Sequence, residues 1–376
     1  MKIAINLLPL RDYTGIEVFT ENLISELSKR FPNIEIILIK HSFSPSFLNF
    51  DGENIRNITI PIKKRRKGWV ALFQQSGIYF VLRRIEPDFL LCPSIAAPFF
   101  YTKKVAVVHD CAYDRFPEEW SGLLSKLHTK LMYAGAKYFS KKIITISRFS
   151  KRELIHYYKI KPERIAIISE GPPHLPNVTP SFVRKTLKKF NIRAPYFLYI
   201  GSTRPRKNIP RLLNAFKAFR SNSPQFLLIL GGSIDTRFLD IVSEIKRFGL
   251  QNSVIQTGFL SNEEKSALYR RAVALTLPSL YEGFGLPVLE AQSVGIPVLT
   301  SNTSSLPQVA GEGASFVDPY SIESIASGMN RIAEDVALRR VLIEKGYENV
   351  KRFSWGRTAR ELVDILKSIN HENTSR

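Results

Sequence analysis

Strand-length apolar runs recur along the whole chain and constrain its fold more than any other feature. They are continuous rather than alternating, as in KIAINLL (2–8), IEIILIK (34–40) and KVAVVHD (104–110). Continuous apolar strands are typical of parallel sheets that are buried on both faces. Amphipathic stretches such as VFTENLISELSKRF (18–31) and IPRLLNAFKAFR (209–220) separate the runs. This repetition of strand and helix predicts an α/β protein with doubly wound sheets.

The runs fall into two sets, and the chain is long enough to form two domains. Its 376 residues exceed the size at which one hydrophobic core usually stops growing. The proline-rich stretch GPPHLPNVTPS (171–181) interrupts the periodicity and is the expected linker. We therefore predict two Rossmann-like domains, 1–175 and 185–350, that face each other across a cleft. Ligands of such sheets bind beyond the carboxyl ends of the strands, so the residues after each strand are the candidates for function.

Composition limits the location and the partners of the protein. The net charge of +21 is shared by both halves of the chain and suits nucleic acid, anionic lipid or phosphorylated substrates. Cys92 and Cys111 form neither a metal-ligand spacing nor a disulfide framework, which favours a reducing cytoplasm. The N-terminal MKIAINLLPLRDYTG lacks a cleavage site, and no segment approaches the ~18 apolar residues that span a bilayer. We expect a cytoplasmic protein.

The stretch SLYEGFGLPVLEA (279–291) places two glutamates around a glycine turn. Pro287 suits the first turn of a helix, and free N–H groups at a helix start favour an anion such as a diphosphate. Glu290 would lie about one turn into this helix, where a carboxylate can hold the vicinal hydroxyls of a ribose. Glu282 would lie on the loop nearer to the reacting centre. The residues alone also allow a second interpretation, in which Glu290 favours the helix dipole and Glu282 is a solvated loop residue.

A basic turn follows the predicted strand YFLYI (196–200). Gly201 ends this strand, and Arg206 and Lys207 lie between it and the next helix. Arginine binds phosphate by its fork geometry and lysine as a point charge, so the turn predicts a phosphate site. A solvated basic turn is the alternative.

Two residues of the first half also follow strands. His109 could donate a hydrogen bond to a sugar hydroxyl or stabilise developing charge, although a structural histidine fits equally. Gly15, between the first strand and the first helix, would let the backbone approach a ligand. The chain has no Asp-x-Asp pair for a metal, no phosphate loop and no nucleophile elbow. We therefore expect a function without a metal or cofactor that depends on binding, positive charge and positioning.

Together these residues resemble the glycosyltransferase family 4 enzymes, which have the GT-B fold. The Glu-x7-Glu element of that family matches Glu282 to Glu290, its phosphate-binding pair matches Arg206 and Lys207, and its strand-end histidine matches His109. The segments 144–154, 257–272 and 304–319 are similar as well, so the resemblance covers nearly the whole chain.

The resemblance implies a retaining, metal-independent transfer of a hexose from a nucleotide diphosphate sugar. It implies that Glu290 holds the ribose, that Glu282 positions the donor sugar and that His109 contacts that sugar. Arg206 and Lys207 would stabilise the departing diphosphate. The further donor contacts that it implies are Gly15, Gly201, Gly283, Phe284, Gly285 and Leu286. It makes 1–175 the acceptor-side domain and 185–350 the donor domain, with a final helix at 352–370 that crosses back to the first.

The motifs EGFGLP and RPRKN together resemble those of bacterial mannosyltransferases. GDP-mannose is therefore the first expected donor, and a UDP-hexose is the second. The expected acceptor is a lipid-linked glycan or a polysaccharide of the cell surface. A nucleotide-sugar epimerase or a phosphorylase is the alternative enzyme class. Charge alone points to nucleic acid, and no helix-turn-helix, zinc finger or RNA-binding signature supports it, so no specific nucleic acid is expected.

Two basic, apolar segments could lie on an anionic leaflet at the inner face of the plasma membrane. They are IKKRRKGWVALF (62–73) and LLSKLHTKLMYAGAKYFSKK (123–142). The alternative is an ordinary solvated helix face above a core stripe.

Overall fold

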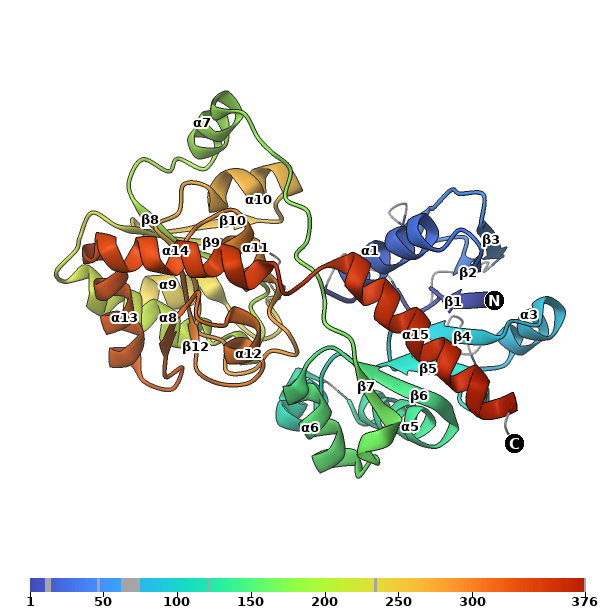
Figure 1. The fold of residues 1–376 in the computed structure, drawn as a ribbon. Helices are drawn as coiled ribbons and strands as arrows, with labels where there is room; N and C mark the ends of the chain where they lie inside the picture. Colours follow the sequence, from blue (N-terminus) through green and yellow to red (C-terminus); the bar gives the residue numbers. More distant parts are fainter. Residues whose placement is uncertain (11–14, 46–47, 62–74, 121, 233–234, 375–376) are drawn as a thin grey trace. The chain divides into compact units, whose positions relative to one another are not determined.

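The computed structural model describes residues 1–10, 15–45, 48–61, 75–120, 122–232 and 235–374. Contacts divide the chain into two compact units (Figure 1). The first unit comprises Met1–Arg115, Trp120–Gly171 and Ser354–Arg376, and the second comprises Phe116–Glu119 and Pro172–Phe353. The predicted membrane segment 62–73 lies outside the described residues.

The first unit contains a parallel seven-stranded sheet with the order β3-β2-β1-β4-β5-β6-β7. The strands are β1 (Lys2–Asn6), β2 (Glu35–His41), β3 (Ile55–Ile60), β4 (Phe89–Cys92), β5 (Lys104–Val107), β6 (Ser140–Thr145) and β7 (Ile165–Ile167). The helices are α1 (Gly15–Arg30), α3 (Gly77–Ile85), α4 (Ala112–Arg115), α5 (Leu123–Phe139), α6 (Arg148–Tyr158), η3 (Pro162–Arg164) and α15 (Trp355–Thr374). The chain winds outward in both directions from β1, which makes the sheet doubly wound.

Helix α15 is the last described element and packs in the first unit beside α1 (Figure 1). The Phe19 ring of α1 meets the Trp355 ring edge-on at a centroid distance of 6.0 Å. The Thr358 hydroxyl donates a hydrogen bond to the Ser169 carbonyl at 2.7 Å. These contacts attach the start of α15 to α1 and to the segment that follows β7.

The second unit contains a parallel six-stranded sheet with the order β10-β9-β8-β11-β12-β13. The strands are β8 (Tyr196–Ile200), β9 (Leu227–Gly231), β10 (Val254–Gly258), β11 (Ala274–Leu277), β12 (Val298–Ser301) and β13 (Ser315–Val317). The helices are η2 (Pro117–Glu119), α7 (Pro180–Lys189), η4 (Pro205–Lys207), α8 (Ile209–Arg220), α9 (Ile241–Arg247), α10 (Asn262–Tyr269), α11 (Leu286–Ser293), α12 (Leu306–Ala310), α13 (Ile322–Glu334) and α14 (Val336–Val350). The predicted fold class, two parallel and doubly wound α/β sheets, is confirmed.

One strand escaped the sequence prediction. Among the described strands, β3 pairs with β2 alone at the edge of the first sheet, and most of its residues are exposed or half-buried. Its sequence, IRNITI, interrupts the apolar positions with Arg56, Asn57 and Thr59, as expected for a strand that is not covered on both faces. The continuous runs that identify the central strands therefore do not occur in it.

Candidate active site

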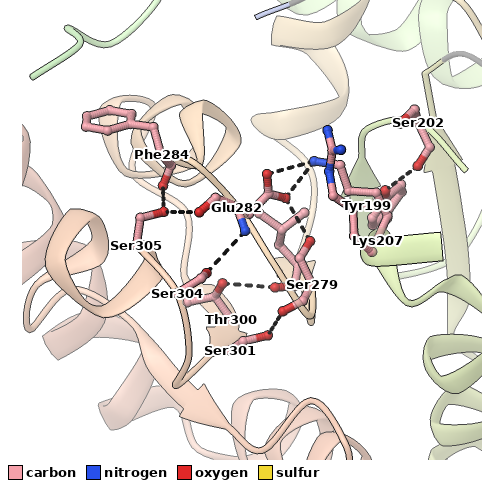
Figure 2. A network of polar contacts seen from close by, with 12 residues as sticks. Tyr199, Ser202, Lys207, Ser279, Glu282, Phe284, Thr300, Ser301, Ser304 and Ser305 are labelled. Carbon is pink, nitrogen blue, oxygen red and sulfur yellow. Dashed lines mark hydrogen bonds and ion pairs between the residues drawn. The ribbon is translucent and has the colours of Figure 1, made fainter. Parts of the chain in front are cut away.

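Lys207 and Glu282 form an ion pair at the carboxyl edge of the second sheet. The short helix η4, directly after β8, carries Lys207, and the loop after β11 carries Glu282. Lys207 Nζ lies 2.6 Å and 2.8 Å from the two carboxylate oxygens of Glu282 (Figure 2). The Ser279 hydroxyl donates a third hydrogen bond to Glu282 Oε1 at 2.8 Å. With side-chain exposures of only 14% and 10%, the two charges are held in one geometry rather than solvated separately.

A second set of hydrogen bonds fixes the loop that carries Glu282. The Ser305 hydroxyl lies 2.9 Å from the Glu282 carbonyl and 2.8 Å from the Phe284 carbonyl. The Glu282 N–H donates to the Ser304 hydroxyl at 3.2 Å (Figure 2). Gly285 precedes α11 with a φ of 109°, which favours glycine at this position. These contacts hold the backbone of the loop in place at Glu282.

The expected donor contacts in this loop differ in their surroundings. The Phe284 ring is buried and meets the Phe353 ring edge-on at 5.7 Å, so it belongs to the packing of the unit. Gly283 and Gly285 are buried, and Leu286 begins α11, whose first turn directs N–H groups out of the helix. Only the backbone of this segment could bind an anion.

Arg206 adjoins the same site but already has a carboxylate partner. Its Nη1 donates to Glu119 Oε2 at 2.9 Å, and the Glu119 side chain is fully buried. The Leu280 N–H donates to the Arg206 carbonyl at 2.8 Å and so joins the turn after β8 to the loop after β11. The contact between Glu119 and Arg206 within this unit was not predicted from the sequence.

Glu290 lies one turn into α11 and is bound from α10. Lys265 Nζ lies 2.6 Å from Glu290 Oε1, and the Tyr269 hydroxyl donates to Oε2 at 2.8 Å. Burial and then the negative Glu290 raise the pKa of Tyr269 well above its ordinary value, so this phenol stays a donor. Each carboxylate oxygen has two acceptor sites, and the bonds from these described residues use one site on each oxygen. The carboxylate can still accept hydrogen bonds from two vicinal hydroxyls.

Lys207 thus pairs with Glu282, whereas Glu290 is bound by two side chains of α10. Lys265 and Tyr269 escaped the sequence prediction. Their spacing of four residues on a helix, within a segment similar to the family, is the signal that could have identified them. Gly201 follows β8, and a Cβ there would lie 2.6 Å from the Tyr199 hydroxyl, so packing already requires glycine.

In the first unit, His109 is buried between two acceptors. Its Nε2 lies 2.9 Å from the Pro93 carbonyl oxygen, and its Nδ1 lies 3.6 Å from Glu170 Oε1. Burial lowers the pKa of His109. The effects of Glu170, the Pro93 carbonyl and Asp110 together outweigh the effect of burial, so the pKa of His109 is raised. Glu170 escaped the sequence prediction, although it follows β7 just as His109 follows β5. Gly15 begins α1 after four residues that lie outside the described ones.

Comparison with known families assigns both halves of the chain. Residues 184–349 match the family described as glycosyl transferases group 1, and residues 13–172 match Glycosyltransferase Family 4. Only the two ends and a short segment between the matches are left out. The chain belongs to the group 1, family 4 glycosyltransferases. The glutamate pair of this glycosyltransferase and its basic turn lie inside the first match, and His109 lies inside the second.

Individual relatives agree with the family. The glycosyltransferase is 29% identical over 310 residues to O-antigen chain mannosyltransferase B of Escherichia coli, which covers 81% of this chain and 78% of that protein. It also has the fold of WaaG, a glycosyltransferase involved in lipopolysaccharide biosynthesis, with a TM-score of 0.76, 16% identity and coverage of 97% and 99%. Anabaena Alr3699/HepE in complex with UDP-glucose gives a TM-score of 0.75, 18% identity and coverage of 98% and 100%. These structural likenesses establish the GT-B fold.

The site of this glycosyltransferase offers fixed charges and hydrogen-bonding groups. Among the described residues, no group of three histidine, cysteine, aspartate or glutamate side chains could hold a metal ion. What the second unit offers instead is a lysine whose charge is held in place, the start of α11 and a carboxylate with vacant acceptor sites. These are groups that bind phosphates and sugar hydroxyls.

Proposed function

We propose that this protein transfers a hexose, with retention of configuration, from a nucleotide diphosphate sugar to an acceptor. The observation that carries the proposal is the buried Lys207–Glu282 pair beside the start of α11, with Glu290 one turn further along the same helix. Together with the family, this arrangement supports Lys207 and Arg206 at the diphosphate, Glu290 at the ribose and Glu282 at the donor sugar. His109 would contact the same sugar from the first unit.

The proposed roles follow the charge that develops during transfer. The bond between the anomeric carbon and the leaving phosphate oxygen breaks while the acceptor hydroxyl oxygen forms a new bond to that carbon, and the hydroxyl proton passes to the departing phosphate. The sugar then resembles an oxocarbenium ion, and negative charge grows on the departing phosphate. Fixed cations stabilise this growing charge without reorganising, which lowers the barrier. Glu282 holds the ammonium group of Lys207 in place for this purpose.

Mannose, carried by GDP, is the donor sugar that we favour, and a UDP-hexose is the second candidate. The support for mannose is the resemblance to O-antigen chain mannosyltransferase B. The support for a UDP-hexose is the HepE structure with UDP-glucose, which shares the fold. The names of O-antigen chain mannosyltransferase B and of WaaG support an acceptor in cell-surface glycan synthesis, either a lipid-linked glycan or a polysaccharide.

Purified protein incubated with labelled GDP-mannose or UDP-glucose and a lipid-linked glycan acceptor tests the proposal. We expect transfer of label to the acceptor and a loss of about 10²-fold in kcat for Glu282→Gln, because its charge no longer holds Lys207. Glu312→Gln is the matched control, since Glu312 forms an ion pair with Lys345 but is 82% exposed. Release of an epimerised nucleotide sugar without acceptor would favour the epimerase instead. Equal rates for Glu282→Gln and the wild type would contradict the proposed site.

We also propose that α5 contacts an anionic membrane. Leu123, Leu127 and Leu131 are spaced by four residues and are 82%, 53% and 46% exposed, so they form one apolar stripe on the helix. The helix carries Lys126, Lys130 and Lys137 and has no acidic residue. A basic helix with an exposed apolar stripe suits the boundary between lipid headgroups and acyl chains. No described helix is both long and apolar enough to span a membrane.

Co-sedimentation with vesicles tests the membrane contact. We expect binding to vesicles that contain phosphatidylglycerol, weaker binding at high salt, and a loss of binding for the double variant L127E/L131E. V336E/V341E on α14 is the matched control, because Val336 and Val341 are also 53% and 44% exposed. Equal sedimentation of the two double variants would contradict the role of α5.

A further inference from the structure

We infer that Glu170 is a positioning residue that keeps His109 as an imidazolium, so that His109 serves the reaction as a hydrogen-bond donor and not as a base. This inference rests on the proposed function for the use of His109. The state of the imidazole itself can be measured without any substrate.

The contacts of His109 determine its protonation. Its Nε2 faces the carbonyl oxygen of Pro93 at 2.9 Å, and a carbonyl can only accept a hydrogen bond. Its Nδ1 faces the Glu170 carboxylate at 3.6 Å, and an ionised carboxylate also only accepts. A neutral imidazole has one N–H, so beside an ionised Glu170 one of its nitrogens would face an acceptor without a proton. Burial raises the pKa of Glu170, whereas the positive charge of His109 opposes that rise. With Glu170 ionised, only the imidazolium presents a proton to both acceptors.

Burial makes this requirement strict. The side chains of His109 and Glu170 are 11% and 3% exposed, so water cannot readily replace either partner. An unsatisfied polar atom in such a place destabilises the fold, and an unpaired charge destabilises it more. The ion pair satisfies both groups at once.

The residues before and after Glu170 both contact helix α15. The Thr358 hydroxyl of α15 donates to the Ser169 carbonyl at 2.7 Å. A Cβ on Gly171 would lie 2.5 Å from the Trp355 backbone nitrogen, so the chain touches α15 there as well. The first turns of α15 therefore fix the segment that presents the carboxylate.

Contacts from α1 and α6 also help to hold His109 in place. From α1, the Phe19 ring meets the imidazole edge-on at 5.0 Å. From α6, the Ser150 hydroxyl donates to the His109 carbonyl at 2.9 Å. The charged groups that act on the ring are Glu170 and Asp110, both negative, and they oppose the effect of burial and raise the pKa of His109.

This arrangement assigns a direction to proton donation. Glu170 retains the Nδ1 proton, so the Nε2 proton remains available to an oxygen of the donor sugar in exchange for the Pro93 carbonyl. A histidine bound in this way cannot remove a proton from the acceptor hydroxyl. Activity should accordingly fall as the pH rises through the raised pKa of His109, where the second ring proton is lost.

Nitrogen-15 NMR of the histidine ring in the full-length protein tests the inference. We expect both ring nitrogens of His109 to carry protons at pH 6.5 in the wild type, and a lower midpoint of titration in Glu170→Gln. The control is Glu153→Gln, since Glu153 is 8% exposed and pairs with Arg115 at 3.1 Å in the same unit. An unchanged His109 titration in Glu170→Gln, or a neutral wild-type ring at pH 6.5, would overturn the inference.

Activity gives an independent readout. For Glu170→Gln we expect kcat to fall roughly 10²-fold at pH 8 and to recover toward the wild type at low pH, where the ring is protonated in both proteins. KM for the donor should change little. A loss that is equal at every pH would indicate a purely structural role and would also overturn the inference. Should Glu170→Gln fail to fold, Glu170→Asp keeps the charge, and the wild-type spectrum alone still decides the protonation state.

Discussion

At the residue scale, the second unit separates two tasks between two buried carboxylates. Glu282 accepts three hydrogen bonds, two from Lys207 and one from Ser279, which suits a residue that holds a cation in place. Glu290 has one donor on each oxygen, from Lys265 and Tyr269, and so keeps acceptor sites for a ligand. The same residue type therefore has two different roles because its neighbours differ.

The ribose contact of Glu290 predicts a selective loss of affinity. In Glu290→Gln, the affinity for GDP should fall by about 10- to 100-fold, since a hydrogen bond to a charged group contributes about 1.5–3 kcal/mol. The affinity for 2′,3′-dideoxy-GDP, which lacks both hydroxyls, should be the same for variant and wild type. Isothermal titration calorimetry measures both constants. An equal loss for the two nucleotides would show that Glu290 acts on the fold and not on the ribose.

At the element scale, buried amides anchor the helix that carries Glu290. Gln292 on α11 donates to the carbonyls of Ala310 and Gly313 at 2.8 Å and 3.1 Å. Asn349 on α14 donates to Gln292 Oε1 and to the Val309 carbonyl, both at 2.7 Å. Helix α11 is thereby fixed to α12 and α14 by side-chain hydrogen bonds as well as by apolar packing.

Removing one member of this network should destabilise the protein. Asn349→Leu leaves two buried acceptors without a donor, so the free energy of unfolding should fall by about 1–3 kcal/mol. Urea denaturation measures this change, and Asn222→Leu at an exposed turn position is the control. A loss no larger than that of the control would mean that water replaces the missing amide.

The sequence predicted elements better than partners. The central strands were found because both of their faces are buried, and the start of α11 was found because Pro287 suits the first turn of a helix. Edge strand β3 was missed because its exposed positions break the apolar run. The partners Lys265, Glu119 and Glu170 were missed for another reason. They are brought to their sites by tertiary contacts between segments far apart in the sequence. A local pattern, such as the spacing of Lys265 and Tyr269, can mark a candidate residue but does not identify its partner.

At the scale of the whole molecule, most of the residues proposed for the donor belong to one unit. Arg206, Lys207, Glu282 and Glu290 follow β8 and β11, which are neighbours in the second sheet. In a parallel sheet the carboxyl ends of all strands lie at the same edge, so one nucleotide sugar can reach these loops together. The first unit contributes the buried His109–Glu170 pair and the exposed stripe of α5. Donor binding and membrane contact should therefore respond to different mutations.

The binding of GDP and guanosine to Lys207→Met, compared with the wild type, tests the central claim most directly. Lys207 is proposed to bind the diphosphate and not the nucleoside. We therefore predict that the variant, checked for an unchanged fold by circular dichroism, binds GDP at least about tenfold more weakly. Its affinity for guanosine should equal that of the wild type. Unchanged affinity for GDP, or an equal loss for GDP and guanosine, would contradict a phosphate site at the edge of the second sheet.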